Sequence, residues 1–144
     1  MKVRNPWERE IRAALTSELL KKPYRQQVER GASPMTGHCY VASEAFFALN
    51  GGRAAGLKPM TIRHEGEPHW WIRDAAGRDI DLTAEQFATP VPYAKGVGKG
   101  FLTKLPSKRA QTVIDRVRHR VEVGSKINPA DRKGTMKMRR NSGS

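Results

Sequence analysis

Apolar residues recur at helical spacing close to the N-terminus of the chain. Asn5 is typical of an N-cap, Pro6 of a first helical position, and Glu8 follows the cap by three residues. The residues that follow form one apolar stripe at helical spacing, made of Trp7, Ile11, Ala14, Leu15 and Leu19. Lysines suit the C-terminal end of a helix, so we expect this helix to end at residues 21–22, before Pro23.

Three other segments have helical signals. We expect a helix that begins between Gly37 and Cys39 and ends at Asn50, with an apolar face made of Cys39, Ala42, Phe46 and Leu49. A last helix follows the N-cap residue Ser107, and its inward positions are Ala110, Val113, Ile114, Val117 and Val121. Between them, Thr83–Gln86 has the capping-box pattern that opens a short helix.

The middle of the chain has the patterns of short β-strands. Residues 57–64, 69–73 and 79–83 are bounded by turn residues and predict three strands, with a polar turn over 65–68. Ala75–Gly77 fits a three-residue hairpin loop with Gly77 in the left-handed conformation, and Asp74 suits its first position. Residues 90–100 are rich in Pro and Gly and are expected to form an ordered loop, which either covers the edge of the sheet or contacts a substrate or phosphate.

The hairpin loop fixes which residues of its two strands oppose each other. Ile72 then faces Ile80, and Trp70 faces Leu82, on the face that we expect to cover the core. Helices packed on one such short antiparallel sheet make an α+β fold.

The opposite face of the same hairpin carries polar residues. There Arg73 meets Asp79 as an ion pair, and Trp71 meets Asp81. His69 and Asp81 become diagonal neighbours on this face, at a separation that long or aromatic side chains bridge. The register therefore places an imidazole beside a carboxylate.

Length and composition favour a single domain. The chain has 144 residues, of which 38% are hydrophobic. We predict one α+β domain over residues 1–123 and a flexible tail over residues 124–144, where apolar residues become rare. No apolar run approaches the roughly 18–20 residues of a membrane span, and no signal peptide precedes the first helix. We therefore expect a cytoplasmic protein without a membrane partner.

Positive charge is concentrated at the two ends of the chain. Residues 1–36 carry eight Lys and Arg against four Asp and Glu, residues 37–103 carry seven of each, and residues 104–144 carry twelve against three. Such asymmetry indicates an anionic partner, and DNA or RNA is the commonest. The plainer interpretation is that the charge keeps a small protein soluble. The tail residues that would contact phosphates are Lys126, Arg132, Lys133, Lys137, Arg139 and Arg140.

The single cysteine lies where a nucleophile would be activated. One cysteine excludes an intrachain disulfide framework and a cysteine-rich zinc site. A helix N-terminus and a neighbouring imidazolium both favour a thiolate, so we expect the pKa of Cys39 to be lowered. His69 beside Asp81 is an oriented general base, and N–H groups at the helix start can hold an oxyanion. Cys39, His69 and Asp81 thus provide nucleophile, base and orienter.

The segments around these three residues resemble a known superfamily. Residues 37–45 around Cys39, residues 69–71 and residues 77–83 are similar to the transglutaminase-like and papain-like cysteine hydrolases, especially small phage and bacterial members. The resemblance covers roughly residues 36–87. It implies a papain-like core, with Cys39 as nucleophile, His69 as base and acid, and Asp81 as orienter. No glutamine lies a few residues before Cys39, where papain-like enzymes place one, so the second oxyanion donor stays unassigned.

Each of these residues also has a plainer interpretation. A lone cysteine is usually a small buried hydrophobe, and a single histidine on a strand is usually structural. His38 is a rival base, although neighbours on a helix do not face each other. Cys39, His38 and His69 are also conceivable as metal ligands, but no ligand spacing favours this.

The prediction is therefore a cysteine hydrolase or acyl transferase, encoded by a bacterium or a phage, that needs no cofactor. It would act on an amide, peptide or isopeptide bond of a protein or peptide substrate. The alternative is a non-enzymatic nucleic-acid-binding protein that uses its basic N- and C-terminal regions. Cys39→Ser would abolish the activity of the first and leave the second unchanged.

Overall fold

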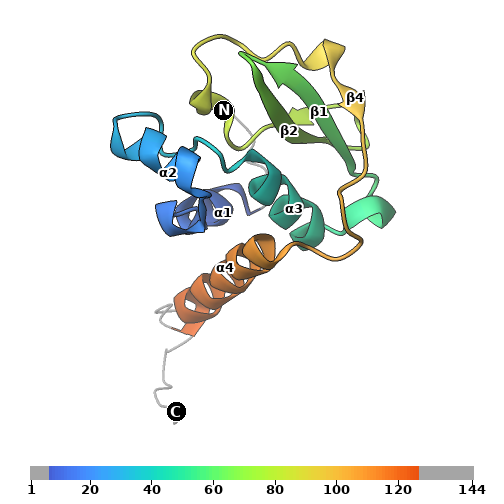
Figure 1. The fold of residues 1–144 in the computed structure, drawn as a ribbon. Coiled ribbons are helices and arrows are strands. Elements are labelled where there is room, and N and C mark those ends of the chain that lie inside the picture. The colour runs from blue at the N-terminus through green and yellow to red at the C-terminus, as the bar shows by residue number, and fades with distance from the viewer. Residues whose placement is uncertain (1–6, 127–144) are drawn as a thin grey trace, which may run out of the picture.

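The computed structural model of the chain describes residues 7–126, in which helices pack on one face of a small sheet (Figure 1). The helices are α1 (Glu8–Ala14), α2 (Lys22–Glu29), α3 (Cys39–Leu49) and α4 (Lys108–Lys126). The strands are β1 (Lys58–His64), β2 (Glu67–Arg73), β3 (Asp79–Ile80) and β4 (Val97–Gly98). Strands and helices occupy separate stretches of the chain, so the fold is α+β, as the sequence predicts.

The sheet is antiparallel throughout, with the strand order β3-β2-β1-β4. The predicted turn over 65–68 is shorter than expected. Glu65 and Gly66 turn the chain by themselves with φ values of 51° and 79°, so β2 already begins at Glu67. The predicted strand over 79–83 is shorter too, because pairing ends at Ile80. Strand β4 was not predicted, since it lies within the Pro- and Gly-rich segment 90–100.

The hairpin between β2 and β3 has the predicted register. Ile72 pairs with Ile80 and Arg73 with Asp79. Gly77 has φ 85°, and its N–H donates to the Asp74 carbonyl at 2.9 Å, as a type I turn followed by a left-handed glycine requires. The Arg73 Nε donates to Asp79 Oδ1 at 2.8 Å, so the predicted cross-strand ion pair is confirmed.

The predicted first helix is wrong at its C-terminal end. Helix α1 ends at Ala14, and Leu15 is extended with φ −84° and ψ 102°. Pro23 lies in the first turn of a separate helix, α2, instead of ending the first one. Proline suits that position because the first N–H groups of a helix have no intrahelical partner. The proposed N-cap Asn5 lies outside the described residues.

Most of the apolar core lies between the helices and the sheet. Helix α3 is central: residues from Cys39 to Phe46 are almost all buried, and the helix packs against β2 and α4. From α4, the predicted inward residues Ala110, Val113, Ile114 and Val117 belong to this core, whereas Val121 is 38% exposed. Ile72, Ile80 and Leu82 cover it from the sheet.

The other face of the sheet is also buried, which the sequence did not predict. Trp71 is only 1% exposed and packs with Met60 and Val91 in a second, smaller cluster. Residues of the following loop, including Phe87 and Tyr93, close over this cluster. Trp70, expected in the core, is half-buried instead and forms an edge-to-face contact with Tyr40.

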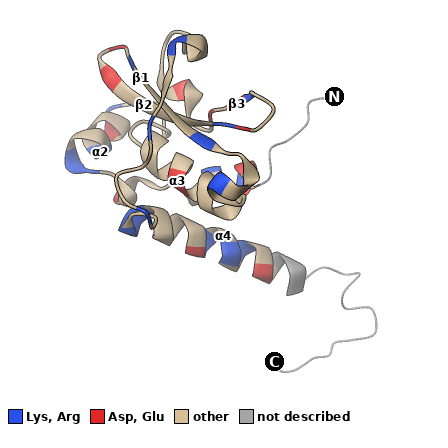
Figure 2. Ribbon diagram, turned by 90° about the vertical axis from the view of Figure 1, so that its right-hand side faces the viewer, with Lys and Arg blue, Asp and Glu red and all other residues tan. Residues whose placement is uncertain are grey.

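A buried carboxylate fixes the start of α4 against α3. Glu44 on α3 is 2% exposed and accepts hydrogen bonds from the Ser107 N–H at 3.0 Å and from Ser107 Oγ at 2.6 Å. Ser107 Oγ in turn accepts the Ala110 N–H at 3.2 Å, as expected of an N-cap. Figure 2 shows that basic and acidic residues alternate along α4 as it extends from the domain. The helix reaches Lys126, beyond the predicted domain boundary at residue 123.

No helix among residues 7–126 is long and apolar enough to cross a membrane.

Candidate active site

Cys39 is the first residue of α3, as the sequence predicts. The loop before it depends on Gly37, which has φ 80° and lies so close to Tyr24 that a Cβ would be 2.7 Å from the ring. Glycine alone tolerates both conditions. The turn delivers the cysteine to the sheet, where Sγ lies 3.9 Å from the Pro68 carbonyl oxygen on β2.

His69 and Asp81 form the pair predicted from the hairpin register. The His69 Nε2 lies 2.6 Å from Asp81 Oδ2, and neither side chain is more than 4% exposed. Tyr93 OH donates to the same carboxylate oxygen at 2.8 Å. A neutral imidazole that donates from Nε2 to this carboxylate has Nδ1 as its acceptor atom. The predicted pairing of Trp71 with Asp81 is wrong. The indole N–H of Trp71 donates instead to Asp79 Oδ1 at 2.8 Å.

Cys39 contacts the backbone of β2, whereas His69 belongs to that strand and points to the face away from the helices. Trp70 and Ile72 point toward the helices, whereas His69 points to the opposite face and stacks on Trp71. Cys39 Sγ meets the backbone edge of β2, and among the described residues no hydrogen bond joins it to His69. The structure thus brings His69 and Asp81 into contact, and it places the thiol against the residue that precedes His69 in the strand, Pro68.

The Gln86 side chain lies between the thiol and the imidazole. Its Nε2 is 3.4 Å from His69 Nδ1 and 3.0 Å from Thr83 Oγ1, and its Oε1 accepts the Gly37 N–H at 3.3 Å. The same side chain is among the groups that lower the pKa of Cys39 against the effect of burial. In the sequence, Gln86 stands out only as the last residue of the capping-box pattern. That segment is a short 3₁₀ turn over Ala84–Gln86, and Thr83 does not cap its backbone.

Helix α1 holds the segment that carries Asp81 and Gln86. Arg12 donates to the Leu82 carbonyl at 2.6 Å and forms a bidentate ion pair with Glu85. The hydrogen bond to Glu85 raises the pKa of Arg12, and the pair lowers the pKa of Glu85. A planar guanidinium that binds both groups positions this segment more firmly than a single contact would.

The predicted fall in the pKa of Cys39 is wrong for the structure as it stands. Burial raises the pKa of the thiol to about 11, and the charge of Asp81 acts in the same direction. Hydrogen bonds from the Trp70 N–H, the Gln86 amide and the Tyr40 N–H act the other way but do not compensate. Desolvation of a charged thiolate outweighs these interactions. The resting thiol is therefore protonated.

The rival base His38 lies in a different environment. It is 2% exposed, its Nε2 has no hydrogen-bond partner among the described residues, and burial lowers its pKa to about 4. A histidine kept neutral and without a partner is poorly suited to accept a proton near neutral pH. Within residues 7–126, no group of three or more His, Cys, Asp and Glu side chains is placed to hold a metal ion.

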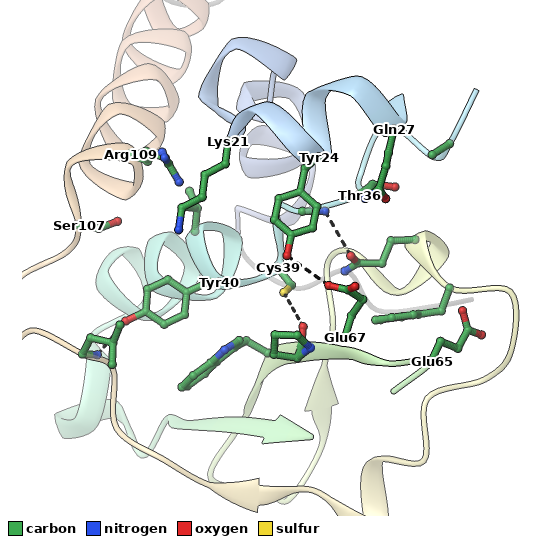
Figure 3. A pocket seen from close by; sticks show the side chains of 18 of the residues that line it. Lys21, Tyr24, Gln27, Thr36, Cys39, Tyr40, Glu65, Glu67, Ser107 and Arg109 are labelled. Atoms are coloured by element: carbon green, nitrogen blue, oxygen red, sulfur yellow. Dashed lines mark hydrogen bonds between the residues drawn. The ribbon is translucent and has the colours of Figure 1, made fainter. Parts of the chain in front are cut away.

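A cleft of about 860 Å³ opens in front of Cys39 (Figure 3). Its lining includes Tyr24, Cys39, Tyr40, Trp70 and Gln86. His69 has no exposed surface and lies behind Gln86 and Phe87, both of which line the cleft and contact its ring. A substrate in this cleft would meet the sulfur directly and the imidazole only after Gln86 moves.

Only one of the six predicted nucleic-acid-binding residues lies among the described residues. Lys126 ends α4, and the remaining five, Arg132, Lys133, Lys137, Arg139 and Arg140, lie outside the described residues. Binding of DNA or RNA by this region stays a prediction from charge.

No protein-family model, no curated protein and no solved structure matches this chain, so the geometry of the site is the basis for its function.

Proposed function

We propose that the protein is a cysteine hydrolase or acyl transferase that works through a thioester on Cys39. One observation carries the proposal: the Gln86 amide nitrogen lies 3.4 Å from His69 Nδ1, and the same side chain lines the cleft with Cys39 and is among the groups that act on the pKa of its thiol. A helix that opens with the cysteine, and a histidine and an aspartate on the neighbouring hairpin, also support the resemblance to papain-like and transglutaminase-like enzymes.

The protonated thiol determines the order of the chemical steps. With a pKa of about 11, Cys39 has to lose its proton as it attacks, which makes His69 Nδ1 a general base rather than the partner of a preformed thiolate. The sulfur bonds to the acyl carbon of an amide while its proton passes to Nδ1. The carbon–nitrogen bond then breaks, and the leaving amine takes that proton. Water, or an acceptor amine, attacks the thioester with the same base and returns the proton to sulfur.

Asp81 and Gln86 have separate tasks in this sequence. Asp81 holds the Nε2 proton at 2.6 Å and stabilises the imidazolium that forms after proton transfer. Gln86 has to turn away from Nδ1 before the thiol proton reaches the imidazole. Its amide N–H is then available to the developing oxyanion beside Cys39, together with the N–H groups that already act on the sulfur.

The proposal is tested by acylation with p-nitrophenyl acetate, followed as release of p-nitrophenolate and as a mass increase on Cys39. We expect acylation by the wild-type protein and none on Cys39 in Cys39→Ser. Asp81→Asn and His69→Ala should slow the reaction about 10²- to 10⁴-fold, because the general base is misoriented or absent.

His64→Gln is the matched control. His64 lies on β1 and contacts the same Phe87 ring as His69, but its polar partners are Thr89 and Glu65, and no interaction with Cys39, His69 or Asp81 is seen among the described residues. Its acylation rate should equal that of the wild type. Asp81→Asn keeps the shape of the buried carboxylate, and circular dichroism checks that it is folded. Equal rates for wild type, folded Asp81→Asn and His69→Ala would refute the general-base role.

A further inference from the structure

We propose that the cleft in front of Cys39 selects an extended peptide that carries an acidic side chain on one side of the reacting bond and a basic side chain on the other. This inference rests on the proposed function, since it names the substrate class of the same site. The observation behind it is that the two ends of the cleft carry opposite charge, with the sulfur between them (Figure 3).

One end of the cleft is cationic. Lys21 comes from the start of α2, and Lys108 and Arg109 come from the first turn of α4. All three side chains are exposed, and within residues 7–126 none of them forms an ion pair or donates a side-chain hydrogen bond. Three unpaired cations from two helices are complementary to a carboxylate of the substrate.

The other end of the cleft is acidic. Glu67 accepts a hydrogen bond from Tyr24 OH at 3.2 Å, which fixes its carboxylate at the cleft wall. Glu65 accepts the Thr89 N–H at 2.8 Å, and its hydrogen bonds to Thr89 lower the pKa of its carboxyl group. The two carboxylates suit a basic side chain of the substrate.

The middle of the cleft favours a peptide over a nucleic acid. Tyr40 and Trp70 form an aromatic wall, with ring centroids 4.9 Å apart, next to the sulfur. A strand of nucleic acid carries a phosphate at every nucleotide, so it would bring negative charge against Glu65 and Glu67. A peptide places an uncharged segment at the aromatic wall, and its acidic and basic side chains can each meet the end of the cleft that carries the opposite charge. A volume of about 860 Å³ is within the range of ordinary ligand sites.

The test measures binding without chemistry, using the Cys39→Ala variant of the full chain. Fluorescein-labelled, terminally blocked peptides Glu-Glu-Ala-Gln-Ala-Lys-Lys and Lys-Lys-Ala-Gln-Ala-Glu-Glu are compared with versions that are all-acidic, all-basic or neutral. We expect one of the two mixed-charge peptides to bind tightest, by about fivefold for each matched end at low salt. The preference should shrink as the salt concentration rises.

Charge-reversing variants identify which end of the cleft binds which charge of the peptide. Arg109→Glu should weaken the mixed-charge peptide and strengthen the all-basic peptide, and Glu67→Lys should strengthen the all-acidic peptide. Arg118→Glu, on the exposed outer side of the same helix, is the matched control and should change neither.

Equal affinity for the mixed and neutral peptides, or an equal effect of Arg109→Glu and Arg118→Glu, would overturn the inference. So would tighter binding of a single-stranded oligonucleotide that competes with the peptides for the cleft. Failure here is distinguishable from failure of the proposed function, because p-nitrophenyl acetate is small and uncharged and acylates Cys39 without using either end of the cleft.

Discussion

The two faces of strand β2 pack against different kinds of surroundings. Ile72 points toward the helices and joins the large apolar core built from α1, α3 and α4. Trp71, the preceding residue, points the other way into a small cluster with Met60 and Val91. His69 shares that second face, where it stacks on Trp71 at a centroid distance of 5.7 Å.

The difference shows how stability and chemistry are divided within one strand. On the helix side, burial of apolar surface provides most of the stability. On the other side, polar groups are held by one another: the buried Asp81 side chain accepts from His69 and Tyr93, and the more exposed Asp79 accepts from Trp71 and Arg73. Such groups are tolerated inside a protein because their hydrogen bonds are made.

The largest effect is expected from truncation on the helix side. Ile72→Ala removes a fully buried side chain and leaves a cavity, so the free energy of unfolding should fall by about 2–5 kcal/mol. Urea denaturation followed by circular dichroism measures this loss. A loss below about 1 kcal/mol would show that the helix-side core does not provide most of the stability.

The helix side should also respond to pH through His38, at the start of α3. Burial lowers its pKa from 6.5 to about 4, so the unfolded chain takes up a proton in this interval and the folded chain does not. The contribution of neutral His38 to the free energy of unfolding is therefore complete above about pH 6.5. It is lost as the pH falls from 6.5 to about 4, by up to about 3 kcal/mol in total. Urea titrations at several pH values measure the slope.

His38→Leu should remove most of this slope, because the unpartnered Nε2 is replaced by an apolar group. His119→Gln on the exposed surface of α4 is the control and should keep the wild-type slope. An identical pH dependence in wild type and His38→Leu would contradict the assignment.

The smallest effect on stability is expected on the other face. Tyr93→Phe removes one hydrogen bond to Asp81 and keeps the ring that packs on Trp71, so the free energy of unfolding should fall by about 1–2 kcal/mol. Because the Asp81 carboxylate loses a partner but keeps His69, acylation of Cys39 should be slowed by less than in Asp81→Asn. Acylation slower in Tyr93→Phe than in Asp81→Asn would contradict the positioning role of Tyr93.

Local sequence patterns were sufficient to predict the register of the hairpin and the start of α3. The loop Asp74–Gly77 determines the register of β2 and β3, and the register places His69 beside Asp81. The turn before Cys39 is similarly local, because Gly37 adopts a conformation that favours glycine. These parts of the candidate site depend on residues close together in the chain.

The parts that the sequence did not reveal depend on contacts between distant residues. Trp71 is buried by the loop around Val91, which lies 20 residues further along the chain. Gln86 is held by a hydrogen bond from Gly37 and by the ion pair between Arg12 and its neighbour Glu85. The raised pKa of Cys39 is similar, since the helix terminus was visible in the sequence but the degree of burial was not. Pro23 was misread because proline both ends and begins helices, and only tertiary packing decides.

The arrangement of the sheet has a consequence for self-association. Its two long strands, β1 and β2, lie in the centre, and each outer strand, β3 or β4, is only two residues long. Unpaired backbone groups at a long outer strand would be a template for pairing with another molecule. Where β3 stops, the thiol of Cys39 and the first turn of α3 cover the continuing margin of β2. The start of α3 therefore lies where a strand of another molecule would otherwise have to pair with β2.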